Sequence, residues 1–124
     1  MTSNKKAFEE FTDINISSAA KVIQDEHQDM GQDYGKILAL QLDDITKKDL
    51  ELSVLKSKFF NASIYYDTNI VDEEKLIEFG NIQGLWYRDK TGYSFFGRTI
   101  NSRDNITAKI DTTKMEAKFQ YLSD

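Results

Sequence analysis

The chain has 124 residues, of which 40% are hydrophobic and 30% are charged, and its net charge is −5. This composition argues against a disordered chain and predicts one folded domain over residues 1–124. Cysteine is absent, which excludes disulfide frameworks, thiolate catalysis and cysteine-ligated zinc. The first residues are polar, and no stretch has the apolar length of a transmembrane helix, so we expect a cytoplasmic protein without membrane contact.

Two helices are predicted at the amino-terminal end. Residues 4–11 form a short helix whose Ala7, Phe8 and Phe11 share one face. Residues 17–30 carry apolar side chains at spacings of three and four, which is typical of a longer helix packed on a core. Gly31 is placed to end that helix.

The periodicity then changes to two, which predicts strands. Apolar residues alternate at 38–42 and again at 50–54. Residues 59–66 are rich in aromatic rings and are expected to form a strand antiparallel to its predecessor. Residues 72–79 begin with three acids and predict a short helix that Gly80 ends.

The last third of the chain predicts two β-hairpins. They connect residues 82–88 with 92–100 and residues 106–111 with 115–122. The chain has no proline, so charge or a partner must protect the strand edges. The predicted class is α+β, with amino-terminal helices packed on a mainly antiparallel, meandering sheet.

One segment differs from the rest in charge and in aromatic content. Residues 83–110 hold 5 Lys and Arg against 2 Asp and Glu, whereas residues 1–82 hold 9 against 16. Residues 84–98 also contain Trp86, the only tryptophan. Aromatic faces interleaved with cations are suited to stack bases and neutralise phosphates. The hairpin over residues 82–100 is therefore predicted to bind single-stranded nucleic acid.

About half of the rings in this hairpin are expected to line the core, because each strand places aromatic residues on both of its faces. We place Trp86 with Arg88 on the open face, and Phe96 with Arg98 beside them if the turn sets the matching register. The predicted nucleic-acid-binding residues are Trp86, Tyr87, Arg88, Lys90, Tyr93, Phe96, Arg98, Arg103 and Lys109.

No motif for catalysis or for a cofactor stands out. The sole histidine, His27, lies in the apolar stripe of the predicted helix, and a metal site would need a second imidazole or a thiolate. We therefore expect a core or boundary histidine. The Glu116-Ala117-Lys118 run has a nuclease-like spacing, but a solvent-facing charge pair is the simpler interpretation. The prediction is a non-enzymatic protein without metal or cofactor.

The acidic total charge leaves a second hypothesis open. In it the chain is an acidic protein-binding module or inhibitor that acts through protein–protein contacts. The acids expected to meet a basic partner are Asp25, Glu26, Asp29 and Asp33. A third hypothesis is a small-molecule pocket between the helices and the sheet, lined by Phe59, Tyr65 and Tyr66. A homodimer formed by edge pairing or by the aromatic face also fits the sequence.

Overall fold

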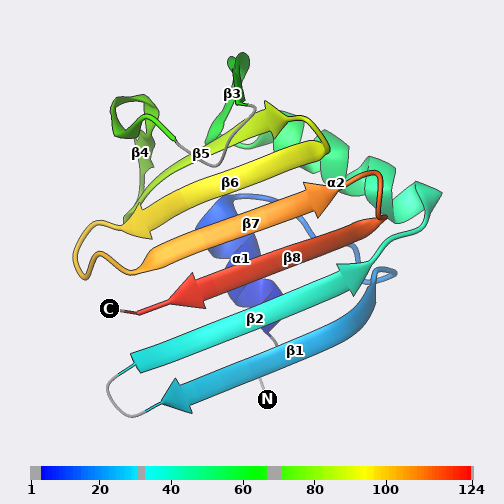
Figure 1. Ribbon diagram of the computed structural model, residues 1–124, viewed down its shortest axis with the longest axis horizontal. Helices are drawn as coiled ribbons and strands as arrows, with labels where there is room; N and C mark the ends of the chain where they lie inside the picture. The colour runs from blue at the N-terminus through cyan, green and yellow to red at the C-terminus, as the bar shows by residue number, and fades with distance from the viewer. Residues whose placement is uncertain (1–3, 31–32, 67–70, 124) are drawn as a thin grey trace.

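The computed structural model describes residues 4–30, 33–66 and 71–123. These residues form two α-helices and one sheet of eight strands, mostly antiparallel, in an α+β arrangement (Figure 1). The helices are α1 (Asn4–Thr12) and α2 (Asp44–Lys56), and η1 (Glu73–Lys75) is a short 3-10 helix. The strands are β1 (Lys21–Met30), β2 (Asp33–Gln41), β3 (Phe60–Tyr66), β4 (Ile77–Phe79), β5 (Ile82–Asp89), β6 (Gly92–Thr99), β7 (Asn105–Asp111) and β8 (Glu116–Leu122).

The strand order across the sheet is β1-β2-β8-β7-β6-β5-β3, and β4 pairs with β5 as well. Strand β8 follows all the others in sequence, yet it lies between β2 and β7. In Figure 1, α1 lies behind the sheet and α2 lies at its right-hand end. Neither α1 nor α2 lies in front of the sheet (Figure 1). We call this front side the helix-free face.

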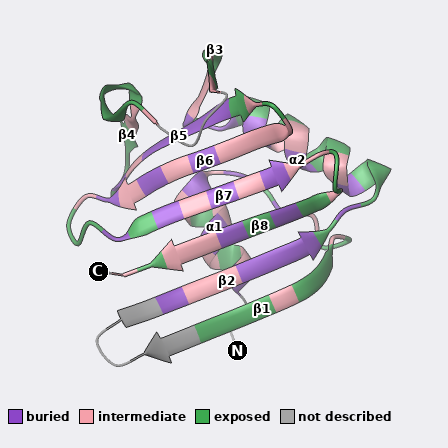
Figure 2. Ribbon diagram, in the orientation of Figure 1, coloured by how far each residue is buried: buried purple, intermediate pink, exposed green. Residues whose placement is uncertain are grey.

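The core lies between the sheet and the helices. Phe8 of α1 is fully buried, and its ring centroid lies 5.5 Å from that of Phe119 in β8. The ring of Phe11 stacks on that of Tyr121, with 5.0 Å between the centroids. Helix α1 confirms the predicted helix over residues 4–11. Figure 2 shows buried residues along β2, β5, β6, β7 and β8, whereas the described side chains of β1 are exposed or intermediate.

The predicted helix over residues 17–30 is wrong, because β1 occupies most of this range. Strand β1 pairs with β2 from end to end, and the register shifts between Val22 and Gln24. This irregularity places Ile23 out of step and interrupts the period of two that would have identified a strand. The remaining apolar spacing imitates a helix, although Ile23 is 50% exposed. Gly31 lies outside the described residues.

The apolar alternation of Leu50, Leu52 and Val54 belongs to α2 and not to the predicted strand. The Asp43 carboxylate accepts a hydrogen bond from the Thr46 backbone N–H at 2.8 Å, which caps the helix and lowers the pKa of Asp43. Leu50 and Val54 lie four residues apart and are buried, whereas Leu52 is 45% exposed. A helical period therefore describes the burial, and a strand period does not.

The other predicted elements are partly confirmed. The predicted strand at residues 38–42 and both hairpins are present as β2, β5–β6 and β7–β8. Strand β3 forms, but it pairs parallel with β5 because its predecessor is a helix. The predicted helix over residues 72–79 is reduced to η1, since β4 pairs with β5 instead. Gly80, at φ 61°, forms the turn between β4 and β5.

Replacing two leucines of α2 tests the helical assignment. Leu50→Ala is expected to lower the free energy of unfolding by about 2–5 kcal/mol, because it leaves a cavity in the core. Leu52→Ala is its matched control and is expected to change stability by about 0.5 kcal/mol or less. Urea denaturation measures both values. Equal losses in the two variants would support the strand and contradict α2.

Candidate binding face

The turn between β5 and β6 decides which aromatic rings share a face. Asp89 pairs directly with Gly92, so two residues form the turn, and Gly92 has a φ of 149° that favours glycine. In this register Trp86 lies opposite Phe95, and paired residues point to the same side of a sheet. Phe96 therefore points to the other side. A shift of one residue in the register would place Phe96 on the same face as Trp86.

Trp86 is a core residue. It is fully buried, its ring centroid lies 5.3 Å from that of Phe95, and its Nε1–H donates to the Thr12 carbonyl oxygen at 2.7 Å. Arg88 shares the helix side of the sheet with it, is exposed, and lies over the Phe60 ring at 5.7 Å. The prediction that Trp86 and Arg88 occupy an open face together with Phe96 is therefore wrong.

The nine predicted binding residues separate into three groups. Those on the helix-free face are Tyr87, Phe96, Arg98 and Lys109. Those on the helix side are Trp86, Arg88 and Tyr93. Lys90 lies in the turn between β5 and β6, and Arg103 lies in the loop between β6 and β7. The structure thus brings four of the nine together on one face.

Directly paired residues form rows across the helix-free face. One row contains Ala39, Lys118, Lys109, Ser94 and Tyr87. The next contains Ile37, Gln120, Thr107, Phe96 and Leu85. A hollow of about 360 Å³ lies over the middle of both rows, lined by Val71 and Tyr87 together with residues of β6, β7 and β8. It has the size and the mixed lining of a small binding site.

The cations of this face differ in how far they are neutralised. Lys109 forms an ion pair with Asp89 at 2.5 Å, and Arg98 forms one with Glu73 at 3.1 Å. Lys118 faces Lys109 across the β7–β8 pair and is exposed. No carboxylate of the described residues lies within ion-pair distance of Lys118. Its positive charge is therefore available to an anionic ligand.

Lys118 was not among the predicted binding residues. Glu116 and Lys118 are both exposed, which agrees with a solvent-facing charge pair, and Lys118 also lies beside the strands of the aromatic hairpin. Two sequence signals locate it. Ala117 and Phe119 alternate with Lys118 and are buried, and the short turn after Asp111 sets the pairing of β8 with β7.

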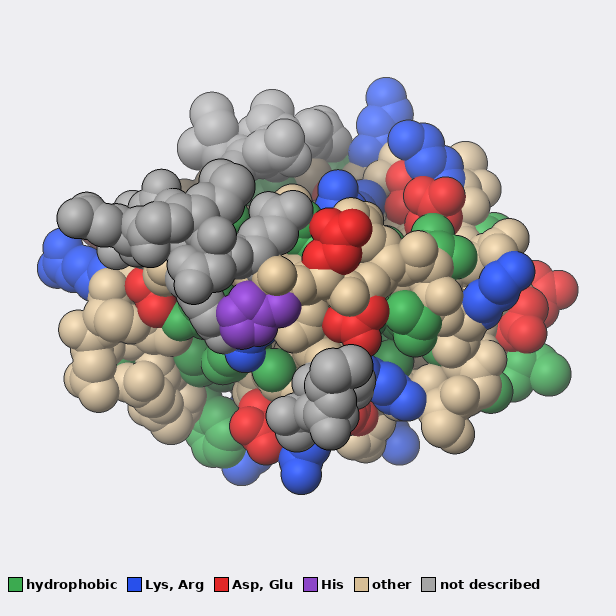
Figure 3. Space-filling model, turned by 90° about the horizontal axis from the view of Figure 1, so that it is seen from below, with side chains coloured by type: hydrophobic (Ala, Val, Ile, Leu, Met, Phe, Trp, Pro, Cys, Tyr) green, Lys and Arg blue, Asp and Glu red, His purple; other side chains and the backbone are tan. Residues whose placement is uncertain are grey.

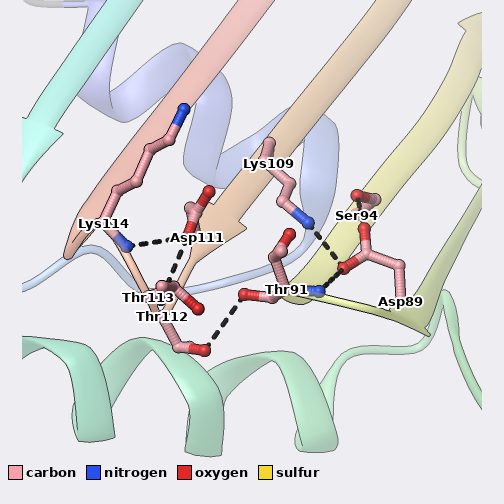
Figure 4. Close-up of polar contacts among 8 residues, drawn as sticks. All are labelled: Asp89, Thr91, Ser94, Lys109, Asp111, Thr112, Thr113 and Lys114. Carbon is pink, nitrogen blue, oxygen red and sulfur yellow. Dashed lines mark hydrogen bonds and ion pairs between the residues drawn. The ribbon is translucent and has the colours of Figure 1, made fainter.

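Asp89 is the centre of a polar cluster at the end of the hairpin (Figure 4). Its carboxylate accepts hydrogen bonds from the Ser94 hydroxyl, from Lys109 Nζ and from the Thr91 backbone N–H at 3.0 Å. Burial raises the pKa of Asp89, but the bonds from Lys109 and Ser94 outweigh burial, so the pKa lies below 3.8. Burial, and then the charge of Asp89, raise the pKa of Tyr87 above 10.0. At neutral pH the carboxylate is ionised and the phenol is neutral.

The edge strand β1 carries the histidine and exposed acids. His27, Asp25 and Glu26 are all exposed, and Figure 3 shows the imidazole (purple) at this surface. The predicted core or boundary position of His27 is wrong, because β1 is an edge strand and the His27 side chain is exposed. The side chains of Asp29 and Asp33, which belong to the predicted acidic set, lie outside the described part of the structure.

The predicted pocket between the helices and the sheet is not formed by its three aromatic residues. Phe59 is buried in the core, 5.6 Å from Phe95 between ring centroids. Tyr66 packs edge-on against Tyr87 at 4.9 Å, and Tyr65 is 56% exposed. The three rings therefore serve different parts of the fold.

The described residues contain no cluster of three or more His, Cys, Asp or Glu side chains placed to hold a metal ion. Every helix among residues 4–30, 33–66 and 71–123 is too short or too polar to span a lipid bilayer. Comparison of the chain with family models, with curated proteins and with solved structures gives no match. The geometry of the helix-free face is therefore the basis for a functional proposal.

The ion pair of Asp89 makes stability depend on pH. Folding lowers the pKa of Asp89, so its contribution is present above the unfolded-state pKa and is lost as the pH falls through the folded value, below 3.8. We expect Asp89→Asn to cost about 0.5–1 kcal/mol at neutral pH, a value scaled for a partly exposed ion pair.

Urea denaturation at a series of pH values measures this difference. The difference in free energy of unfolding between the wild-type chain and Asp89→Asn should become smaller below about pH 4. Glu116→Gln removes an exposed carboxylate and is the control that should show no such difference. A difference that stays constant from neutral to acidic pH would contradict the assignment.

Proposed function

We propose that this chain is a non-enzymatic binding protein whose helix-free face binds single-stranded nucleic acid. One observation carries the proposal: the half-buried ring of Phe96, the hollow of about 360 Å³ and the Lys118 ammonium, which has no carboxylate partner among the described residues, lie together on this face. These are the elements that single-strand binding needs, namely a stacking surface, room for a base and a cation for phosphate.

The hollow supplies contacts for a base. Phe96 lies beside Thr107 in its row, and Gln120 follows on β8. The hydroxyl and amide groups of these neighbours both donate and accept hydrogen bonds, so they suit the edge of a base stacked on the ring. Tyr87 lines the same hollow and remains neutral, which keeps a negative charge away from the ligand.

The distribution of charge favours contact with nucleic acid at the helix-free face and opposes it on the rest of the surface. Lys109 and Arg98 are paired with carboxylates, whereas Lys118 has no ion pair with any residue that the structure describes. The chain as a whole has a net charge of −5, so nucleic acid is repelled from most of its surface. Affinity is therefore expected to be modest and confined to one face.

The absence of cysteine fits a reducing compartment, and we place the protein in the cytoplasm.

Fluorescence anisotropy of labelled single-stranded DNA and RNA at two salt concentrations tests the proposal. Lys118→Glu is expected to weaken binding about tenfold at low salt, because it replaces a phosphate contact with repulsion. Phe96→Ala should weaken binding by about 1–3 kcal/mol through the loss of stacking. The label must be on the oligonucleotide, because the buried Trp86 does not report directly on the helix-free face.

The matched control is Arg88→Glu, which makes the same change of charge on the helix side of the hairpin. It should leave affinity nearly unchanged once circular dichroism shows that every variant is folded. Absence of binding by the wild-type chain at low salt would exclude the proposal. Equal weakening by Arg88→Glu and Lys118→Glu would show that the helix-free face is not the site.

A further inference from the structure

A second hollow lies on the helix-free face, next to the one that contains Phe96. It has a volume of about 310 Å³, and its lining residues are Glu73, Gln83, Arg98, Thr99, Ile100 and Arg103. Two of these side chains are cationic and one is anionic, so the lining carries a net positive charge within a chain of net charge −5. A hollow with two guanidinium groups in its lining is suited to bind an anion.

The two hollows are neighbours along β6. Arg98 follows Phe96 by two residues and points to the same side of the sheet, about 6.8 Å further along the strand. The segment over residues 71–73 borders both hollows, since Val71 lines the first and Glu73 lines the second. One nucleotide of an extended single strand covers a similar distance. A strand whose base stacks on Phe96 therefore brings a neighbouring phosphate to the second hollow.

Lys118 and Arg98 lie on opposite sides of Phe96. The row of paired residues that lies toward the β5–β6 turn contains Lys118. The row on the other side of Phe96 contains Asn105, Arg98 and Gln83. Phosphates on both sides of a stacked base would thus each meet a cation. This is the arrangement of a groove that follows the backbone of a single strand.

Arg98 already holds an anionic group of its own chain. Its Nη1 and Nη2 atoms donate hydrogen bonds to Oε1 and Oε2 of Glu73 at 3.4 and 3.1 Å, so one guanidinium holds both carboxylate oxygens. A phosphate accepts the same two parallel bonds from an arginine. The Glu73 carboxylate therefore occupies the position that a phosphate would take.

Glu73 is the member of this ion pair that a ligand can displace. Its side chain is 63% exposed, whereas that of Arg98 is 27% exposed. The Nε–H of Arg98 also donates to Gln83 Oε1 at 3.3 Å, which keeps the guanidinium at the hollow. An exposed ion pair contributes little to stability, so a phosphate that Arg103 also binds can replace the carboxylate.

The loop between β6 and β7 fixes the position of Arg103. The Arg103 backbone N–H donates to the Thr99 carbonyl oxygen at 3.0 Å, and the Asp104 backbone N–H donates to the Thr99 hydroxyl at 2.9 Å. The Asp104 carboxylate accepts hydrogen bonds from the hydroxyl groups of Ser102 and Tyr121. Arg103 itself forms no ion pair with any residue that the structure describes. Its guanidinium is therefore available to an anion in the hollow.

We propose that this hollow is a second phosphate subsite, in which Arg98 and Arg103 bind the phosphate next to the base that stacks on Phe96. Glu73 occupies the subsite in the free protein and is displaced when a strand binds. The inference rests on the proposed function, because it extends the same site along the strand. Glu73 competes with the ligand, so its removal should strengthen binding.

Glu73→Gln tests this competition in fluorescence anisotropy with labelled single-stranded DNA and RNA at low salt. We expect affinity to increase about two- to fivefold, because Arg98 no longer has to give up an ion pair before it meets a phosphate. Glu74→Gln is the matched control, since it removes the same charge from the next residue, which is exposed and forms no ion pair with a described residue. An effect of net charge alone appears in both variants, so the difference between them measures the competition.

Arg103→Glu tests the second cation of the hollow. It should weaken binding about tenfold and reduce the dependence of affinity on salt, because one phosphate contact is lost. Arg88→Glu makes the same change of charge on the helix side of the hairpin and should leave affinity nearly unchanged. Circular dichroism confirms that each variant is folded.

The outcomes separate this inference from the proposed function. Equal affinities of Glu73→Gln and Glu74→Gln, or an affinity that Arg103→Glu leaves unchanged, would overturn the second subsite. If Lys118→Glu still weakens binding in that case, the proposed function stands without the subsite. Absence of binding by the wild-type chain at low salt would overturn both.

Discussion

The carbonyl oxygen of Thr12 joins three parts of the fold. It accepts a hydrogen bond from Trp86 Nε1 at 2.7 Å and another from the Ser57 hydroxyl at 3.2 Å. These donors lie on β5 and at the end of α2, so both helices and the sheet meet at one buried atom. A buried carbonyl left without a partner costs about 1–3 kcal/mol. This junction turns the Trp86 side of the hairpin toward the helices, and Phe96 and Lys118 are left on the other face.

Local sequence signals predicted the part of the fold that depends on local pairing. Short turns and alternating residues identified β2 and the hairpins β5–β6 and β7–β8. Strand β1 was missed because the irregularity at Ile23 hides its alternation. Helix α2 was missed because the outward-facing Leu52 lies between Leu50 and Val54, which gives the run the period of a strand. Both errors arise where exposed apolar residues imitate burial.

Composition located the aromatic hairpin, but it could not orient it. Whether Trp86 and Phe96 lie on opposite faces or share one face depends on whether the turn holds an even or an odd number of residues. The pairing of Asp89 with Gly92 fixes that number, and the sequence alone left it open. Lys118 illustrates a second limit, since its relation to Phe96 depends on the pairing of three strands. Such information comes from tertiary structure and not from the residues of one segment.

The position of β8 has a consequence for how the chain folds. Until β8 is synthesised, no strand connects β2 to β7. The hairpin β1–β2 and the strands β5 to β7 therefore remain two separate parts of the sheet. The two halves join only when a strand about 80 residues after β2 inserts between them, which is a contact of long sequence separation and slow formation. During synthesis the exposed edges of β2 and β7 are therefore the surfaces most open to mispairing.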